Sequence, residues 1–227
     1  MSVAEEFKRM NTRKASVLQI GGFRPTLDPC ATHFGKAPVA HLDETWPCHN
    51  GVPMMAVCQI NLDSAPAVPQ ALADLRLLTF FVAPEADLGR ENGEGWCLRA
   101  YSGLDGLSTL AIPPDAPKIS KGFECLWQEE EDHPHHDDPE TARVPGARWP
   151  QRGFDNVMRS KVGGYASTIQ SEPWWGRDTH PAEPRYCLQI DSEEKLGLAW
   201  GDAGCLFIAR GAAAGYRHCW FLDWQCY

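Results

Sequence analysis

Apolar residues in this chain gather in short runs that Gly and Pro separate, which is the pattern of buried β-strands. The chain contains 20 Gly and 18 Pro, so long helices have little room. We therefore expect short strands throughout most of the chain. The clearest runs are "LRLLTFFVA" (75–83), "GWCLRAYSG" (95–103), "GCLFIARG" (204–211) and "HCWFLDWQ" (218–225).

Helical spacing occurs at two places. Val3, Phe7 and Met10 are spaced i, i+4 and i+7, which predicts an amphipathic N-terminal helix within residues 1–20 that packs on the body of the protein. The stretch "DSAPAVPQALADLRLL" predicts a second helix over residues 63–78. These two helices and the strands predict an α+β fold, mainly antiparallel β-sheet with few short helices.

Two parts of the chain repeat the same order of features. Gly35 precedes Gln59 by 24 positions, and Gly163 precedes Gln189 by 26. Ile follows each Gln, an Asn or Asp comes next, and two strand-like runs complete each part. We expect an internal duplication of two related β-rich repeats within a single compact domain. The expected bounds are about 30–128 and 155–227 for the repeats and 1–227 for the domain.

The stretch between the repeats differs from both of them. Residues 129–150 are acidic, His-rich and without periodicity, which predicts a solvated loop. Its run "EEEDHPHHDD" could chelate a divalent ion weakly, but the chain has no C-x-x-C pair and no H-E-x-x-H motif. We therefore expect neither a metal site nor a cofactor.

Composition restricts the class of protein and its compartment. Hydrophobic residues at 43% and charged residues at 22% are globular values, which exclude a disordered chain. Nine cysteines lie singly and mostly in apolar runs, so they predict buried free thiols in a reducing compartment. No apolar stretch approaches the ~20 residues of a membrane span. We expect a cytoplasmic protein that does not bind membranes.

The charge of the chain bears on its partners. The formal net charge is −9, and Lys and Arg form no cluster longer than a pair. Direct nucleic acid binding needs a basic stripe and is therefore not expected. An acidic surface suits a basic protein partner.

No catalytic motif stands out in the sequence. The loops "QIGGFRP" and "KVGGYAS" match neither the Walker spacing nor the dinucleotide fingerprint. Ser102 lacks the G-x-S-x-G elbow, and nothing in the order of the sequence pairs a cysteine with a histidine. Asp191 and Asp202 could form a carboxylate pair, although turn capping explains both. We expect no catalytic residues and no enzyme.

Loop tryptophans are the remaining signal. Trp174 and Trp175 lie in the polar stretch "SEPWWGRD", where they could anchor a partner or pack between the repeats, and both interpretations stay open. With the matched loops and glutamines they give a set of candidate binding residues. The set is Gly35, Trp46, Gln59, Gly163, Gly164, Gln170, Trp174, Trp175, Gln189 and Asp202.

The motifs "HFGKAP", "CQINL", "SKVGGYAS" and "GDAG" occur in an order that resembles the YwqG-like family of bacterial proteins of unknown function. The resemblance covers roughly residues 30–227. It implies an α+β fold with an internal duplication and no established activity or cofactor. Some relatives are encoded near toxin genes, which implies an immunity or antitoxin-like role. "HFGKAP" lacks the second Gly of "KVGG", so the two loops differ at that position.

Three functional hypotheses follow from these observations. The first is a non-enzymatic binding protein with a toxin-like protein partner. The second is a small-ligand-binding protein that uses a cleft between the repeats, lined by the Gly loops with Gln59, Gln170 and Gln189. The third is a hydrolase whose catalytic groups meet only in the folded chain.

Overall fold

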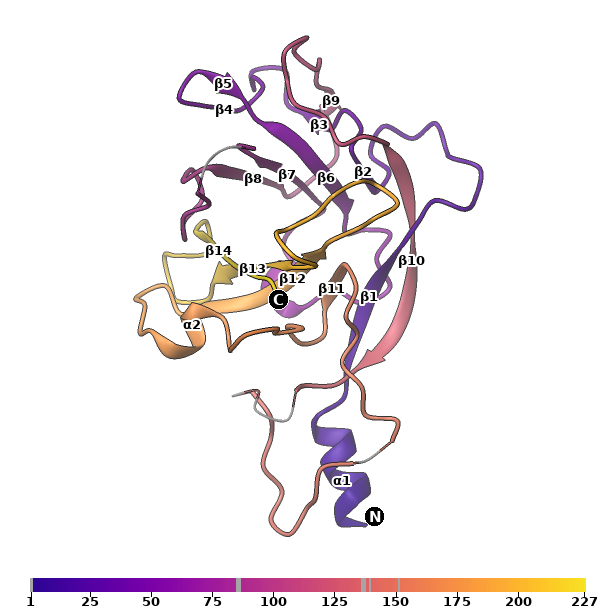
Figure 1. Ribbon diagram of the computed structural model, residues 1–227, viewed down its shortest axis with the longest axis vertical. Coiled ribbons are helices and arrows are strands. Elements are labelled where there is room, and N and C mark those ends of the chain that lie inside the picture. Colours follow the sequence, from indigo (N-terminus) through magenta and orange to yellow (C-terminus); the bar gives the residue numbers. More distant parts are fainter. Residues whose placement is uncertain (1, 85–86, 136–137, 139, 151) are drawn as a thin grey trace.

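The chain folds around one antiparallel sheet of ten strands, in the order β14-β13-β12-β11-β1-β10-β2-β6-β7-β8 (Figure 1). The structure is a computed structural model and describes every residue except 1, 85–86, 136–137, 139 and 151. The strands of the large sheet are β1 (Arg13–Ile20), β2 (His33–Phe34), β6 (Met55–Asn61), β7 (Leu77–Val82), β8 (Trp96–Tyr101), β10 (Phe123–Asp132), β11 (Lys161–Gly163), β12 (Pro184–Asp191), β13 (Cys205–Gly211) and β14 (Trp220–Gln225).

Smaller elements surround this sheet. Two further two-stranded sheets pair β3 (Val39–Ala40) with β9 (Ser108–Thr109) and β4 (Cys48–His49) with β5 (Val52–Pro53). The helices of the described residues are α1 (Val3–Met10), the 3-10 turn η1 (Gln70–Leu72) and α2 (Trp174–Arg177). None of these helices has the length and apolar character that crossing a membrane requires.

The fold is predominantly β, so the expected α+β class is wrong. The described helices contain eight, three and four residues. The helix predicted over residues 63–78 does not form beyond η1, because Pro66 and Pro69 lack the backbone N–H groups that a helix needs. Leu72 and Leu75 of this segment are nevertheless buried in the core, as the sequence pattern indicates.

Two boundaries of the sequence prediction also change. The N-terminal helix expected within residues 1–20 ends at Met10, and the chain continues directly into β1. Glu129–Asp132 complete β10 instead of beginning the loop predicted over residues 129–150, because they pair with β1. Charged residues therefore form part of the central strand pair, where periodicity in the sequence gives no signal.

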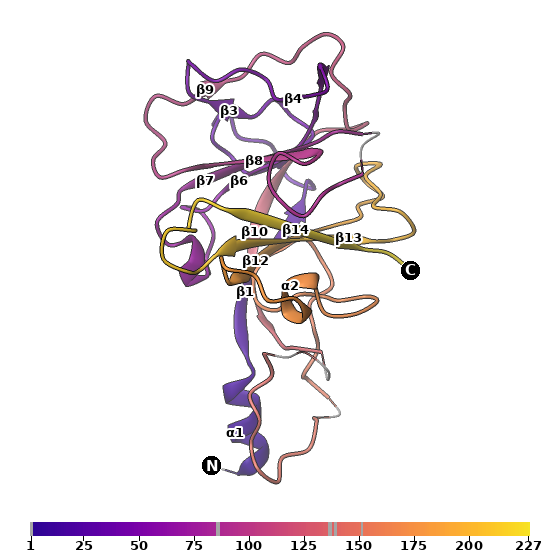
Figure 2. The same ribbon diagram turned by 90° about the vertical axis from the view of Figure 1, so that its left-hand side faces the viewer.

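The helix α1 packs at the end of the molecule, away from most of the sheet (Figures 1 and 2). Phe7 contacts the rings of Trp149 and Phe154 at 5.8 and 5.5 Å. The apolar face of α1 thus packs against the segment that contains Trp149 and Phe154. His136 and Asp137 of that stretch lie outside the described residues.

The large sheet curls until its two edge strands, β8 and β14, approach each other (Figure 2). Residues 90–92 lie between these edges, and we call them the clasp. The Asn92 side chain donates to the Leu98 carbonyl (2.9 Å) and accepts from the Leu98 amide (2.8 Å). On the other side, the Asn92 amide donates to the Trp220 carbonyl, and the Leu222 amide donates to the Arg90 carbonyl. The clasp therefore closes the sheet into a barrel-like shape.

Arg90 also fixes the clasp to α2. Its guanidinium lies 4.6 Å from the Trp174 ring centroid and 2.8 Å from the Asp178 carboxylate. The Trp174 indole donates to the Leu222 carbonyl of β14 (2.9 Å). A stacked cation is held more firmly than an exposed ion pair alone. The short helix α2 thus supports the closure of the sheet.

The two halves of the large sheet have the same arrangement of short and long strands. Each half has a two-residue or three-residue strand, β2 or β11, next to the central β1–β10 pair, followed by three longer strands. One hydrophobic core contains buried side chains of both halves, including Phe34, Phe80, Leu188 and Ile208. Both halves also have an irregular register at one position of β6 and of β12.

The hydrogen bonds of Gln59 and Gln189 match between the halves. Gln59 lies opposite His33, accepts from the Val39 amide (2.7 Å) and donates to the Ala31 carbonyl (2.9 Å). Val39 follows His33 by six positions, and Ala31 precedes it by two. Both bonds fasten a loop to the sheet.

Gln189 makes the same bonds in the second half. It lies opposite Lys161, accepts from the Ser167 amide (3.0 Å) and donates to the Arg159 carbonyl (3.0 Å). Ser167 follows Lys161 by six positions, and Arg159 precedes it by two. This match supports the internal duplication, which stays a proposal.

The residues opposite the two glutamines differ in chemistry. Lys161 is completely buried, and its ammonium lies 2.6 Å from the buried Asp132 carboxylate. His33 is buried, and neither of its ring nitrogens has a hydrogen-bond partner among the described residues. Burial therefore lowers the pKa of His33 to about 4.

We expect Asn92→Ala to lower the free energy of unfolding by about 1–3 kcal/mol, because the Leu98 amide and carbonyl lose their partner at the sheet edge. Urea unfolding measures this loss, and amide exchange at Leu98 should accelerate. Gln70→Ala is the control, because Gln70 is exposed and its side chain is not needed for the closure. Equal stability losses in the two variants would contradict the role of the clasp.

We expect His33 to make the protein acid-sensitive. The unfolded chain binds a proton at His33 below about pH 6.5 and the folded chain only near pH 4, so this histidine lowers the free energy of unfolding by about 3 kcal/mol across that range. Asp191 acts in the opposite direction, because burial raises its pKa to about 6 and the folded carboxyl retains its proton.

His33→Gln removes only the first of these two effects. Urea unfolding of both proteins near pH 7 and near pH 4.5 should show a smaller loss on acidification in the variant than in the wild type. The same loss in both proteins would show that His33 is not the acid-sensitive group.

Candidate functional site

The two predicted Gly loops lie far apart. Gly35 directly follows Phe34, which pairs with Phe123 at the beginning of β10, whereas Gly163 pairs with Ala15 of β1, opposite Glu130 of β10. Seven residues of strand separate these places, a distance of roughly 23 Å. Gln59 and Gln189 are buried and bonded to their own loops. The structure therefore does not bring the matched loops and glutamines together in one groove.

Gly164 has a structural role that the sequence pattern does not indicate. Its φ is +67°, and a Cβ atom there would overlap the Asp132 carboxylate. Asp132 accepts from the Tyr165 amide (2.8 Å) and from the Lys161 ammonium. Only a residue without a side chain lets this buried carboxylate approach the turn.

Most of the other candidate residues also serve packing or loop bonding. Trp46 and Trp174 are buried, and their indoles donate to backbone carbonyls. The exposed Gln170 donates to the Cys226 carbonyl, and the backbone of the exposed Asp202 accepts from the Tyr227 amide. Trp175 is half-buried, and it alone among the ten candidates lines a cavity described below.

A hollow that we call the mouth cleft opens where the two halves meet. Its volume is about 630 Å³. The first half contributes the end of β7 with Ala83, Pro84, Asp87 and Leu88, and the second half contributes the loop before β13 and the end of β14. Its apolar lining includes Met55, Val82, Leu198, Trp200, Leu206 and Trp224.

The mouth cleft continues into a second hollow of about 490 Å³. The two hollows share Ala83, Pro84 and Asp87. Val52 is 56% exposed in the second hollow, and Trp224 is 44% exposed in the first. An exposed apolar surface of this kind is typical of interaction sites. The sequence pattern assigned Trp224 to the core, and its polar neighbours Asp223 and Gln225 are the only signal to the contrary.

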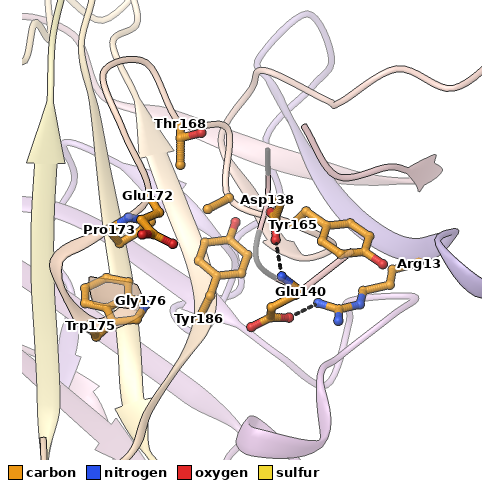
Figure 3. A pocket seen from close by; sticks show the side chains of 11 residues that line it. Arg13, Asp138, Glu140, Tyr165, Thr168, Glu172, Pro173, Trp175, Gly176 and Tyr186 are labelled. Carbon is orange, nitrogen blue, oxygen red and sulfur yellow. Dashed lines mark hydrogen bonds and ion pairs between the residues drawn. The ribbon is translucent and has the colours of Figure 1, made fainter. Parts of the chain in front are cut away.

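A smaller cavity of about 60 Å³ lies beside α2, and we call it the aromatic pocket (Figure 3). Glu172 and Trp175 lie on one side of the Tyr186 ring, and Tyr165, Arg13 and Glu140 lie on the other. Arg13 is 3.9 Å from the Tyr165 ring centroid and 2.7 Å from the Glu140 carboxylate. Sequence reasoning missed most of these residues, because they come from four separate segments.

Metal ligands, thiols and a Ser–Lys contact are the chemical groups to consider among the described residues. These residues contain no group of three or more His, Cys, Asp or Glu side chains that could hold a metal ion. Burial raises the pKa of Cys125 and of Cys187 to about 12, so neither supplies a thiolate near neutral pH. The Ser167 hydroxyl lies 3.3 Å from the Lys161 ammonium, but both groups are buried and hydrogen-bonded within the core.

Comparison with known families places these features in a wider group. A family model described as a domain of unknown function, DUF1963, matches residues 107–226, just over half of the chain. The chain belongs to the DUF1963 family. The matched region contains Trp175 and Tyr186 of the aromatic pocket and Trp224 of the mouth cleft, whereas Arg13 and β6–β8 precede it. No curated protein matches the chain.

In this DUF1963 protein we expect Gly164→Ala to lower the free energy of unfolding by about 3 kcal/mol or more, because the new methyl group meets Asp132 in addition to the strained φ. Gly215→Ala is the matched control: φ is +84° there, and a Cβ atom would have no neighbour within 4 Å. That control should lose only about 1 kcal/mol. Similar losses in urea unfolding would contradict the proposed approach of Asp132.

Proposed function

We propose that this DUF1963 protein is a non-catalytic binding protein whose partner is another protein, and that the partner occupies the mouth cleft. The exposed Trp224 at the edge of an apolar groove carries this proposal. Tryptophan in such a position is a frequent centre of binding energy. The second hollow extends the groove toward Val52, which suits an extended segment of a protein better than a compact metabolite.

The charge of the chain supports a basic partner. A net charge of −9 attracts a basic protein and speeds its association. The YwqG-like resemblance adds a more specific role to this proposal, that of a cytoplasmic immunity or antitoxin-like protein that neutralises a toxin. In that role the protein needs affinity and no turnover, which agrees with grooves lined by apolar rings.

A small ligand is the second candidate. The volume of about 630 Å³ lies within the range of small-molecule sites. Trp200 and Trp224 both line this cleft, so a ligand there would change tryptophan fluorescence. The two candidates differ in whether the occupant survives dialysis of a cell extract.

Photo-crosslinking in the cells that produce the protein tests the proposal. We expect Trp224→p-benzoylphenylalanine to crosslink one discrete protein. Tyr216→p-benzoylphenylalanine is the matched control, because Tyr216 is also an exposed ring (38%) but lies in the turn between β13 and β14. The same adducts at both positions, or none at position 224, would contradict a protein partner. Fluorescence quenching by the dialysable fraction alone would support the small ligand instead.

A further inference from the structure

The aromatic pocket has the size of one side-chain head group. Its volume is about 60 Å³. Sites for metabolites are several times larger. An occupant of this pocket is therefore a small group, such as the end of a side chain that a partner inserts.

The walls of the pocket combine aromatic rings with carboxylates. Tyr165, Tyr186 and Trp175 supply the rings. Asp138, Glu140 and Glu172 supply three carboxylates, and Arg13 is the single Lys or Arg among the described residues of the lining. Burial raises the pKa of Tyr165; the charge of Arg13 opposes this shift, and the charges of Asp138 and Glu140 add to it. The lining therefore suits a cation.

One half of the pocket already holds a guanidinium. Arg13 stacks on the Tyr165 ring and pairs with Glu140. The other half contains Trp175, Tyr186 and the Glu172 carboxylate, which makes no hydrogen bond or ion pair with any described residue. The same combination of ring and carboxylate is thus present twice, and in one copy Arg13 shows that it accommodates a guanidinium.

The half of the pocket that contains Glu172 is built on packed elements. The ring of Trp175 lies 5.6 Å from that of the buried Trp174, and Trp175 and Tyr186 pack against a buried cluster that contains Phe207. A Cβ atom at Gly176 would come within 3.1 Å of the Glu172 carboxylate, so glycine keeps this position open. Rings that are fixed in advance lose little conformational entropy when a ligand binds.

We propose that the aromatic pocket binds the guanidinium of an arginine side chain from a basic protein partner, between the rings of Trp175 and Tyr186 and against Glu172. A guanidinium is planar, stacks on aromatic rings and forms two parallel hydrogen bonds with a carboxylate, whereas the ammonium of lysine is a compact, strongly hydrated charge. This inference rests on the proposed function, because it names the chemistry of the partner.

Titration with two peptides tests the proposal. The probes are acetylated hexa-arginine and acetylated hexa-lysine, which have the same charge, and tryptophan fluorescence or calorimetry measures their binding. We expect the arginine peptide to bind the wild-type protein more tightly. Glu172→Gln should weaken its binding about tenfold, because a charge-assisted hydrogen bond contributes on the order of one such factor.

Glu194→Gln is the matched control, because it removes the same charge from an exposed residue outside the pocket. This variant should change the affinity less than twofold. Equal effects of the two variants, or equal binding of the two peptides, would show attraction by overall charge only and overturn the pocket. Circular dichroism confirms that Glu172→Gln folds.

The outcome is separate from that of the crosslinking experiment. A protein crosslinked from position 224, together with no preference for arginine, would remove the pocket inference and leave the mouth cleft proposal in place. Selective binding of hexa-arginine without any crosslink would support the pocket and remove the cleft.

Discussion

Closure of the sheet by the clasp is the constraint on which the rest of the structure depends. The edges β8 and β14 do not pair with each other directly, and Asn92 supplies a side-chain amide that takes the place of a strand at Leu98. Unpaired strand edges invite association with other chains, so closing them also protects the protein. The clasp holds the β7–β8 hairpin beside β14. It therefore brings together the two walls of the mouth cleft, one from each half.

The two proposed binding features have different physical roles. The mouth cleft offers exposed apolar area around Trp224, which supplies affinity through burial. In the proposal, the aromatic pocket offers the Glu172 carboxylate beside two rings, which supplies selectivity for a guanidinium. The net charge of −9 acts over a longer distance and assists encounter with a basic partner. A protein that neutralises a basic partner needs these three contributions and no catalytic group.

Local sequence signals predicted the buried strands and the matched glutamines, because alternation and Gly spacing report on burial and turns. Gln59 and Gln189 were predicted as ligand-binding residues, yet they fasten loops, since a lone glutamine looks the same in both roles. The length of β1 and β10 could not be predicted, because their pairing joins distant parts of the sequence, as in the contact of Lys14 with Glu129 across 115 positions. The aromatic pocket could not be predicted for the same reason, because Arg13 and Trp175 lie far apart in the sequence and line one cavity only in the folded chain.

Nuclear magnetic resonance of the nine tryptophan indoles tests whether a partner binds at the mouth cleft and the aromatic pocket. The protein labelled with ¹⁵N at tryptophan is recorded in buffer and in extract of the cells that produce it, with signals assigned by Trp→Phe variants. We expect the signals of Trp224, Trp200 and Trp175 to shift or broaden and those of the buried Trp46 and Trp96 to stay unchanged. An unchanged spectrum, or changes confined to Trp46 and Trp96, would contradict binding at these two sites.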